Sequence, residues 1–252
     1  METNIVNRYI MEGIITPSKG FQNNICKSYY SPYRWSQKRA HEWYVNHGRV
    51  TGCNYIPATA GNQLEMWQAE TFDPFTIDKE LSWASHLGFN TIRVFLHNLV
   101  WKQDQQGFLR RLDHFLSIAS KHGIKTIPVL FDSVWNPYPT SGKQPEPRLH
   151  VHNPTWVQCP GYDMLNNPGC YDELQSYVQD IVTAFKDDDR VLMWDLYNEP
   201  DNMNLTSYKD DKYVQRKADL ALALLKKTVA WVRLINPIQP LTMAPWQWED
   251  TS

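Results

Sequence analysis

The sequence of 252 residues has no long apolar run, because none approaches the ~18 consecutive apolar residues that a membrane-spanning helix needs. Residues 1–10 are largely polar and lack the apolar stretch of a secretory signal. We therefore expect no membrane segment. Two locations stay open: the cytoplasm, or a secreted or periplasmic site if a leader is missing from this chain.

An excess of charge of one sign is also absent. The chain has 25 Lys and Arg residues against 27 Asp and Glu residues, which gives a formal net charge of -2. A nearly neutral chain lacks the long-range field that attracts phosphate groups. This balance argues against nucleic acid or an anionic membrane as a partner, and nothing in the sequence implies an obligate protein partner.

Cysteines are few and form no CxxC pair, which excludes a zinc ribbon or a thioredoxin-type motif. Cys159 and Cys170 bracket a loop rich in Pro, Gly and Asn, and they either pair in an oxidising compartment or stay free thiols. A metal site that combines them with His150 and His152 matches no zinc spacing, so we predict no metal and no cofactor. The four cysteines are Cys26, Cys53, Cys159 and Cys170.

Aromatic residues, by contrast, are abundant, with 11 Trp, 13 Tyr and 9 Phe. Such a surplus either fills a core or lines a cleft. The 42% hydrophobic and 21% charged residues fit an ordinary globular domain, and the length allows one large domain.

Hydrophobic patterning predicts strands that alternate with helices, after an irregular extension over residues 1–35. We expect residues 36–252 to form one domain, because such alternation is typical of a parallel sheet. The predicted strands are 50–56, 90–97, 124–131, 191–197 and 241–246, and the predicted helices are 36–48, 76–88, 108–122, 171–186 and 211–235.

Two parallel architectures compete, a doubly wound sheet and a (β/α)8 TIM barrel. No GxGxxG or GxxxxGK[ST] motif marks a doubly wound nucleotide binder. Polar and aromatic residues instead gather where the predicted strands end, as in the site of a barrel. We therefore predict an α/β barrel of which this chain holds about the first five βα units. Those residues are Asn54, Tyr55, Arg93, His97, Asp132, Trp135, Asn198, Glu199 and Trp246.

The strongest chemical feature is the segment Trp194-Asp-Leu-Tyr-Asn-Glu-Pro200. Pro200 blocks further strand pairing, so Glu199 should project above the end of the fourth strand. A carboxyl group there can act as a general acid, or it is a solvated loop carboxylate.

This segment resembles the acid/base strand of glycoside hydrolase family 5 and its cellulase- and mannanase-like relatives in clan A. The likeness also covers Thr51-Gly-Cys-Asn-Tyr-Ile-Pro57, the predicted strand 90–97 and Val129-Leu-Phe-Asp132. The resemblance implies a retaining glycosidase that acts on β-linked poly- or oligosaccharides. It also implies that Glu199 is the acid/base, that Asn198 contacts the sugar 2-hydroxyl and that Arg93 orients the nucleophile.

In that family the nucleophile is a glutamate after the seventh strand, whereas five strands are predicted here. We therefore expect a fragment of a longer protein. Asp132, Glu249 and Asp250 are other carboxylates near strand ends, but none matches the family position. A carbohydrate-binding protein without catalysis and an unrelated barrel enzyme for small polar substrates are the alternative functions.

Several residues have two possible roles. His97 contacts substrate or bridges two loops, and Asp132 contacts substrate or caps a loop. Tryptophans outside regular elements are suited to stack on a sugar face. The predicted sugar platforms are Trp135, Trp156, Trp246 and Trp248, and the predicted core tryptophans are Trp83, Trp194 and Trp231. Asn204-Leu205-Thr206 is a glycosylation sequon, which has meaning in a eukaryotic secretory route.

Overall fold

A computed structural model describes residues 35–208 and 211–247, and the chain divides into two compact units, residues 1–50 and 51–252. The described part of the first unit contains helix α2 (Gln37–His47), which begins where the Ser36 hydroxyl accepts a hydrogen bond from the Arg39 N–H. The helix lies in the first of these units, and the predicted domain boundary between residues 35 and 36 stays a prediction.

The second unit is built on a parallel sheet of five strands whose spatial order follows the chain. A doubly wound sheet reverses its strand order at a switch point, and this sheet does not. The prediction of a partial (β/α) barrel is thereby confirmed. The strands are β1 (Gly52–Asn54), β2 (Thr91–Phe95), β3 (Lys125–Val129), β4 (Trp194–Asn198) and β5 (Leu241–Ala244).

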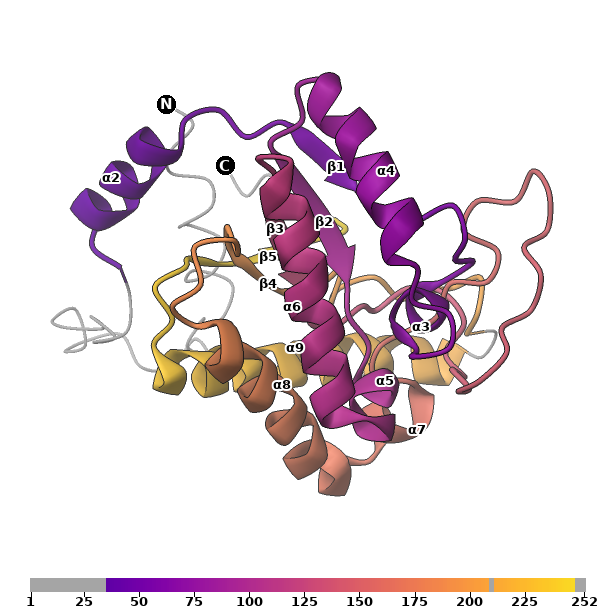
Figure 1. Cartoon of the computed structure of the whole chain (residues 1–252). Coiled ribbons are helices and arrows are strands. Elements are labelled where there is room, and N and C mark those ends of the chain that lie inside the picture. The colour runs from indigo at the N-terminus through magenta and orange to yellow at the C-terminus, as the bar shows by residue number, and fades with distance from the viewer. Residues whose placement is uncertain (1–34, 209–210, 248–252) are drawn as a thin grey trace, which may run out of the picture. The chain divides into compact units, whose positions relative to one another are not determined.

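Helices connect consecutive strands, and α6 lies across β2 and β3 in Figure 1, where α8 and α9 run side by side. Besides the longer helices, short ones occupy segments that the sequence analysis treated as loops. A helix of five or six residues is too short to show a period, which is why these were missed. The helices are α3 (Gln63–Trp67), α4 (Pro74–His86), α5 (Asn98–Gln103), α6 (Gln105–Lys121), α7 (Tyr162–Asn166), the 3-10 helix η1 (Pro168–Cys170), α8 (Tyr171–Phe185) and α9 (Asp211–Ile235).

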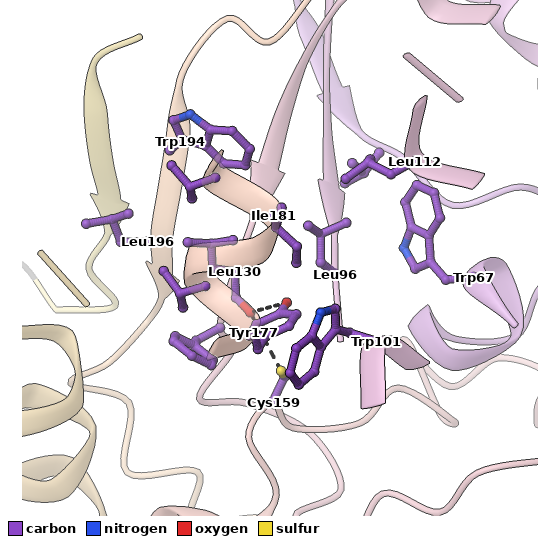
Figure 2. Close-up of a cluster of buried hydrophobic side chains, with 14 of the residues drawn as sticks. Trp67, Leu96, Trp101, Leu112, Leu130, Cys159, Tyr177, Ile181, Trp194 and Leu196 are labelled. Atoms are coloured by element: carbon purple, nitrogen blue, oxygen red, sulfur yellow. Dashed lines mark hydrogen bonds between the residues drawn. The ribbon is translucent and has the colours of Figure 1, made fainter. Parts of the chain in front are cut away.

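The hydrophobic core fills the space between the sheet and its helices, as Figure 2 shows for Trp67, Tyr177, Trp194 and their neighbours. Tyr177 of α8 donates a hydrogen bond of 3.0 Å from its hydroxyl to the Leu130 carbonyl. The buried residues of α8 recur at helical spacing, which confirms the sequence-based interpretation of this helix. They are Tyr171, Leu174, Tyr177, Val178, Ile181, Val182 and Phe185.

Two of the three tryptophans predicted for the core are buried, Trp194 and Trp231. Trp83 is not, since 56% of it is exposed. Helix α4 buries Ile77 and Leu81, which lie one turn apart, and Trp83 lies off that face. Its ring instead packs under the ammonium of Lys79.

The described cysteines Cys53, Cys159 and Cys170 are free thiols, so Cys159 and Cys170 do not pair. Cys159 is buried and contacts the Asn98 side chain and the Leu130 carbonyl. Within the described ranges, no helix combines the length and the apolar character that crossing a membrane requires.

An irregularity in β4 shapes the carboxyl end of the sheet. Asp195 pairs with Thr242 of β5, but the next pair joins Asn198 to Ala244, so β4 has one extra residue. In a regular strand, residues three apart point to opposite faces. The bulge brings Asp195 and Asn198 to the same side, where both bond Arg93 of β2.

Candidate functional site

Arg93 links three strands at the carboxyl end of the sheet. Its Nε and Nη2 atoms lie 2.9 and 2.7 Å from Oδ2 of Asp195. Nη2 also donates to the side-chain oxygen Oδ1 of Asn198 at 2.9 Å, and Nη1 donates to Oδ1 of Asn54 at 3.2 Å. The guanidinium carbon lies 4.7 Å from the centre of the Phe95 ring. Arg93 is therefore held in one position from several directions.

Asp195 is the buried partner of that arginine, with 3% of its surface exposed. Burial raises the pKa of the Asp195 carboxyl, and the charge of Arg93 opposes that rise. Asn54 was among the residues predicted at the strand ends, but Asp195 was not predicted as a site residue. The sole signal was a charged residue inside an apolar strand.

Asn198 has an amide whose orientation is fixed by its neighbours. Its carbonyl oxygen accepts from Arg93, and its NH2 group donates to Oδ1 of Asp132 at 2.9 Å. The backbone of the loop after β3 also meets β4 here, because the Ser133 N–H donates to the backbone carbonyl of Asn198 at 3.0 Å. An amide NH2 group has two protons, so one remains for another acceptor.

Asp132 is buried, with 2% of its surface exposed, and receives several hydrogen bonds. Oδ1 accepts from the Val134 N–H at 3.0 Å as well as from Asn198, and Oδ2 accepts from the Trp135 indole N–H at 3.1 Å. Burial raises the pKa of Asp132 to about 7. These bonds cap the loop after β3, and contact of Asp132 with substrate stays a prediction.

Trp135 has a left-handed backbone, with φ of 78°, and is partly exposed. Its ring meets those of His152 and Trp156 at centroid distances of 5.5 and 5.6 Å. Trp156 itself is only 8% exposed and packs on Phe95. The prediction that Trp156 is a sugar platform does not fit this burial, whereas Trp135 keeps an exposed part.

Glu199 directly follows β4 and also has a left-handed backbone, with φ of 50°. Such a conformation is uncommon for a residue other than glycine, and it is often found at functional sites. The Glu199 N–H donates to the Ala244 carbonyl at 2.6 Å, and Oε2 accepts from the Asn202 side chain at 2.8 Å. The side chain is partly exposed between two buried residues, Asn198 and Pro200.

His97 is fully buried, and both of its ring nitrogens have partners within the protein. Nδ1 accepts from the Leu99 N–H at 3.1 Å and so caps α5, while Nε2 lies 3.1 Å from the Gln158 carbonyl. Burial lowers the pKa of His97 to about 4. These contacts bridge two loops, and contact of His97 with substrate stays a prediction.

Trp246 lies after β5 and is 58% exposed, as a stacking platform requires. Asp201 holds this segment, since its carboxylate accepts from the N–H groups of Trp246 and Gln247, both at 2.8 Å. Trp248, Glu249 and Asp250 lie outside the described residues.

The sequon residue Asn204 is buried, and its side-chain NH2 donates to the Trp135 carbonyl at 2.8 Å. In the folded chain this amide is therefore not available for glycosylation. Lys217 of α9 is also buried close to the site, and the sequence analysis missed it. Across the described ranges, no three His, Cys, Asp or Glu side chains group as metal ligands would.

The fold and this group of side chains define a class of barrel proteins whose sites lie at the carboxyl ends of the strands. Residues 51–251 match the family model for cellulase (glycosyl hydrolase family 5), and the chain belongs to that family. The sequence has no match among curated proteins.

Similar solved structures include the β-1,4-mannanase of the sea hare Aplysia kurodai, with 19% identity, a TM-score of 0.51 and coverage of 79% of this chain and 60% of that chain. The GH5_18 structure from Streptomyces cattleya in complex with GlcNAc has 14% identity and a TM-score of 0.50, over 79% of this chain and 45% of that chain. The β-mannanase of the blue mussel Mytilus edulis has 14% identity and a TM-score of 0.50, over 78% and 59%. This chain thus spans about half the length of these proteins, and the likeness shows the fold.

Proposed function

We propose that this chain carries the acid/base part of a retaining glycoside hydrolase site for β-linked poly- or oligosaccharides, with Glu199 as the general acid/base. One observation supports this most strongly. The partly exposed Glu199 carboxyl follows directly on Asn198, whose amide is fixed by Arg93 and Asp132 at the carboxyl edge of the sheet.

In the proposed mechanism, Glu199 donates a proton to the glycosidic oxygen while the bond to the anomeric carbon breaks. A second carboxylate attacks that carbon and forms a glycosyl-enzyme intermediate. The deprotonated Glu199 then takes a proton from the water that displaces the second carboxylate. Two displacements at one carbon restore its configuration, so the product retains the anomeric form of the substrate.

Asn198 binds the sugar in this proposal. One N–H of the Asn198 side chain donates a hydrogen bond to Asp132, and the other is free to donate to a hydroxyl of the sugar, which we assign to the 2-hydroxyl. Arg93 holds the amide carbonyl, so the NH2 group cannot rotate away. The exposed faces of Trp135 and Trp246 serve as stacking surfaces for neighbouring sugar rings.

We propose that the nucleophile is not among these 252 residues. A retaining pair has its carboxyl groups about 5–5.5 Å apart, and the nucleophile must be free to attack. Asp132 is a second described carboxylate near the strand ends, but it is buried and both of its oxygens accept hydrogen bonds from the protein, so it is not free to attack. The compared structures are longer than this chain, which supports a nucleophile on a further part of the protein.

The stereochemistry of the first product tests this proposal. The protein from the complete reading frame is mixed with β-linked manno-, cello- and xylo-oligosaccharides, and proton NMR follows the anomer that appears before mutarotation. The proposal predicts the β-anomer for any substrate that is cleaved. Release of the α-anomer would exclude a retaining mechanism, and binding without cleavage would favour the carbohydrate-binding alternative.

A further inference from the structure

Lys217 of α9 is a buried lysine with 1% of its surface exposed. Its ammonium donates a hydrogen bond to the backbone carbonyl of Asn202, in the loop that follows β4. Lysine is almost never fully buried unless it is paired, because burial removes the water around its charge. The proposed mechanism gives Lys217 no role, so the burial of this cation needs a separate explanation.

Asn202 connects this lysine to Glu199. Its side-chain NH2 donates to Oε2 of Glu199 at 2.8 Å, and its backbone N–H donates to the Glu199 carbonyl at 2.9 Å. Its own side-chain oxygen accepts from the Asn204 N–H at 2.7 Å. Asn202 thus holds the Glu199 carboxyl through its side chain and is itself held by Lys217 through its carbonyl.

Among the described residues, the charged groups that act on Lys217 are three carboxylates. Asp132 faces it from the loop after β3, and Glu199 and Asp201 face it from the loop after β4. Burial lowers the pKa of Lys217 to about 8, and the three carboxylates oppose that shift. At neutral pH the side chain is mostly the ammonium, and it loses its charge within a range that an experiment can reach.

We propose that Lys217 is a positioning residue that acts through Asn202: its ammonium fixes the loop after β4 and so sets the position of the Glu199 carboxyl. The meaning of this role for catalysis rests on the proposed function of Glu199. The chain of contacts itself does not, because it is a property of the folded 252 residues.

The proton and nitrogen chemical shifts of the Asn202 side-chain amide test this proposal in the 15N-labelled 252-residue chain. Between pH 6 and pH 10 these signals should move with a midpoint near pH 8 in the wild-type chain, because Lys217 loses its charge there. Lys217→Met should abolish the transition near pH 8, whereas any step near pH 7 that comes from Asp132 should remain in every variant. Lys217→Arg should keep the low-pH signal close to that of the wild type and also lack the transition near pH 8, since arginine stays charged.

Lys226→Met is the matched control, because Lys226 is an exposed lysine on the same helix. This variant should keep the wild-type transition. If Lys217→Met does not fold, Lys217→Arg decides alone. A transition near pH 8 that persists in either Lys217 variant, or its absence from the wild type, would overturn the proposal.

This readout does not need catalysis, so the two proposals can fail separately. A normal Asn202 transition in a protein that does not hydrolyse sugars would leave the contact chain standing and remove the function of Glu199. Hydrolysis with retention, together with an Asn202 signal that does not change in the Lys217 variants, would support the function of Glu199 and exclude the positioning role of Lys217.

Discussion

At the scale of single residues, the site depends on one arginine that satisfies partners on two other strands. Arg93 reaches Asp195 and Asn198 of β4 and Asn54 of β1, so it sets the relative position of the strands as well as the direction of the Asn198 amide. A planar guanidinium can do this because its N–H groups point in several fixed directions. Arg93 can therefore pair with the buried Asp195 carboxyl and at the same time fix the Asn198 amide, as the proposed function requires.

Removing the Arg93 side chain should be costly, because Asp195 would remain buried and unpaired. We expect Arg93→Met to lower the free energy of unfolding by about 3–5 kcal/mol, measured by urea denaturation. Lys102→Met breaks a more exposed pair with Glu173 and should cost less than about 1 kcal/mol. Similar losses in the two variants would contradict this account of Arg93.

The buried carboxyl of Asp132 should make stability depend on pH. Its pKa in the folded chain is about 7, above its ordinary value of 3.8, so the folded state holds a proton that the unfolded state has already lost. The stability that this group contributes is complete below about pH 4 and is lost as the pH rises towards 7.

Relative to Asp132→Asn, the free energy of unfolding of the wild-type chain should fall by up to about 4 kcal/mol over that range. Asn carries no titrating proton, so any fixed loss from its altered hydrogen bonds is the same at each pH. Denaturation at pH 4, 5, 6 and 7 measures the difference, and a difference that is flat or grows with pH would refute the assignment.

At this scale the sequence predicted the site residues that belong to a local motif. Arg93, Asn198 and Glu199 stand out through their place at strand ends. Asn54 stands out in the same way, but Asp195 does not, because its importance comes from an arginine that is distant in the chain. Lys217 was missed for the same reason, since one lysine in a helix gives no sign of which carbonyl it meets.

At the scale of elements, alternating patterns predicted the long helices and the order of the strands well. The bulge in β4 could not be predicted, because it depends on how β5 pairs with it. The short helices α3, α5 and α7 depend on local capping and on tertiary contacts, as His97 shows for α5. A prediction based on hydrophobic periodicity alone assigns such short segments to loops.

Helix α9 offers a matched test of its buried face. Leu224 is fully buried, whereas Leu222 is 37% exposed. We expect Leu224→Ala to lower the free energy of unfolding by about 2–5 kcal/mol, because it leaves a cavity against the sheet. Leu222→Ala should change it by less than about 1 kcal/mol. Equal effects in chemical denaturation would show that α9 is packed by a different face.

At the scale of the whole molecule, five parallel strands in chain order bring residues from distant parts of the sequence to one edge. This is how a barrel gathers a site from several loops, and it explains why Arg93 bonds Asn198 although 105 residues separate the two in the chain. The sequence predicted this architecture from alternation and from where polar residues fall. It did not predict which loops pack over the site, because long loops carry little periodic signal.

The central claim is that Glu199 is the general acid/base, and its dependence on the leaving group tests this most directly. In the protein from the complete reading frame, Glu199→Gln should lower the rate on glycosides with poor leaving groups by about 10²–10⁴-fold. Activated aryl glycosides need little protonation, so they should still form the glycosyl-enzyme at a rate close to that of the wild type. An equal loss on both kinds of substrate would contradict the claim.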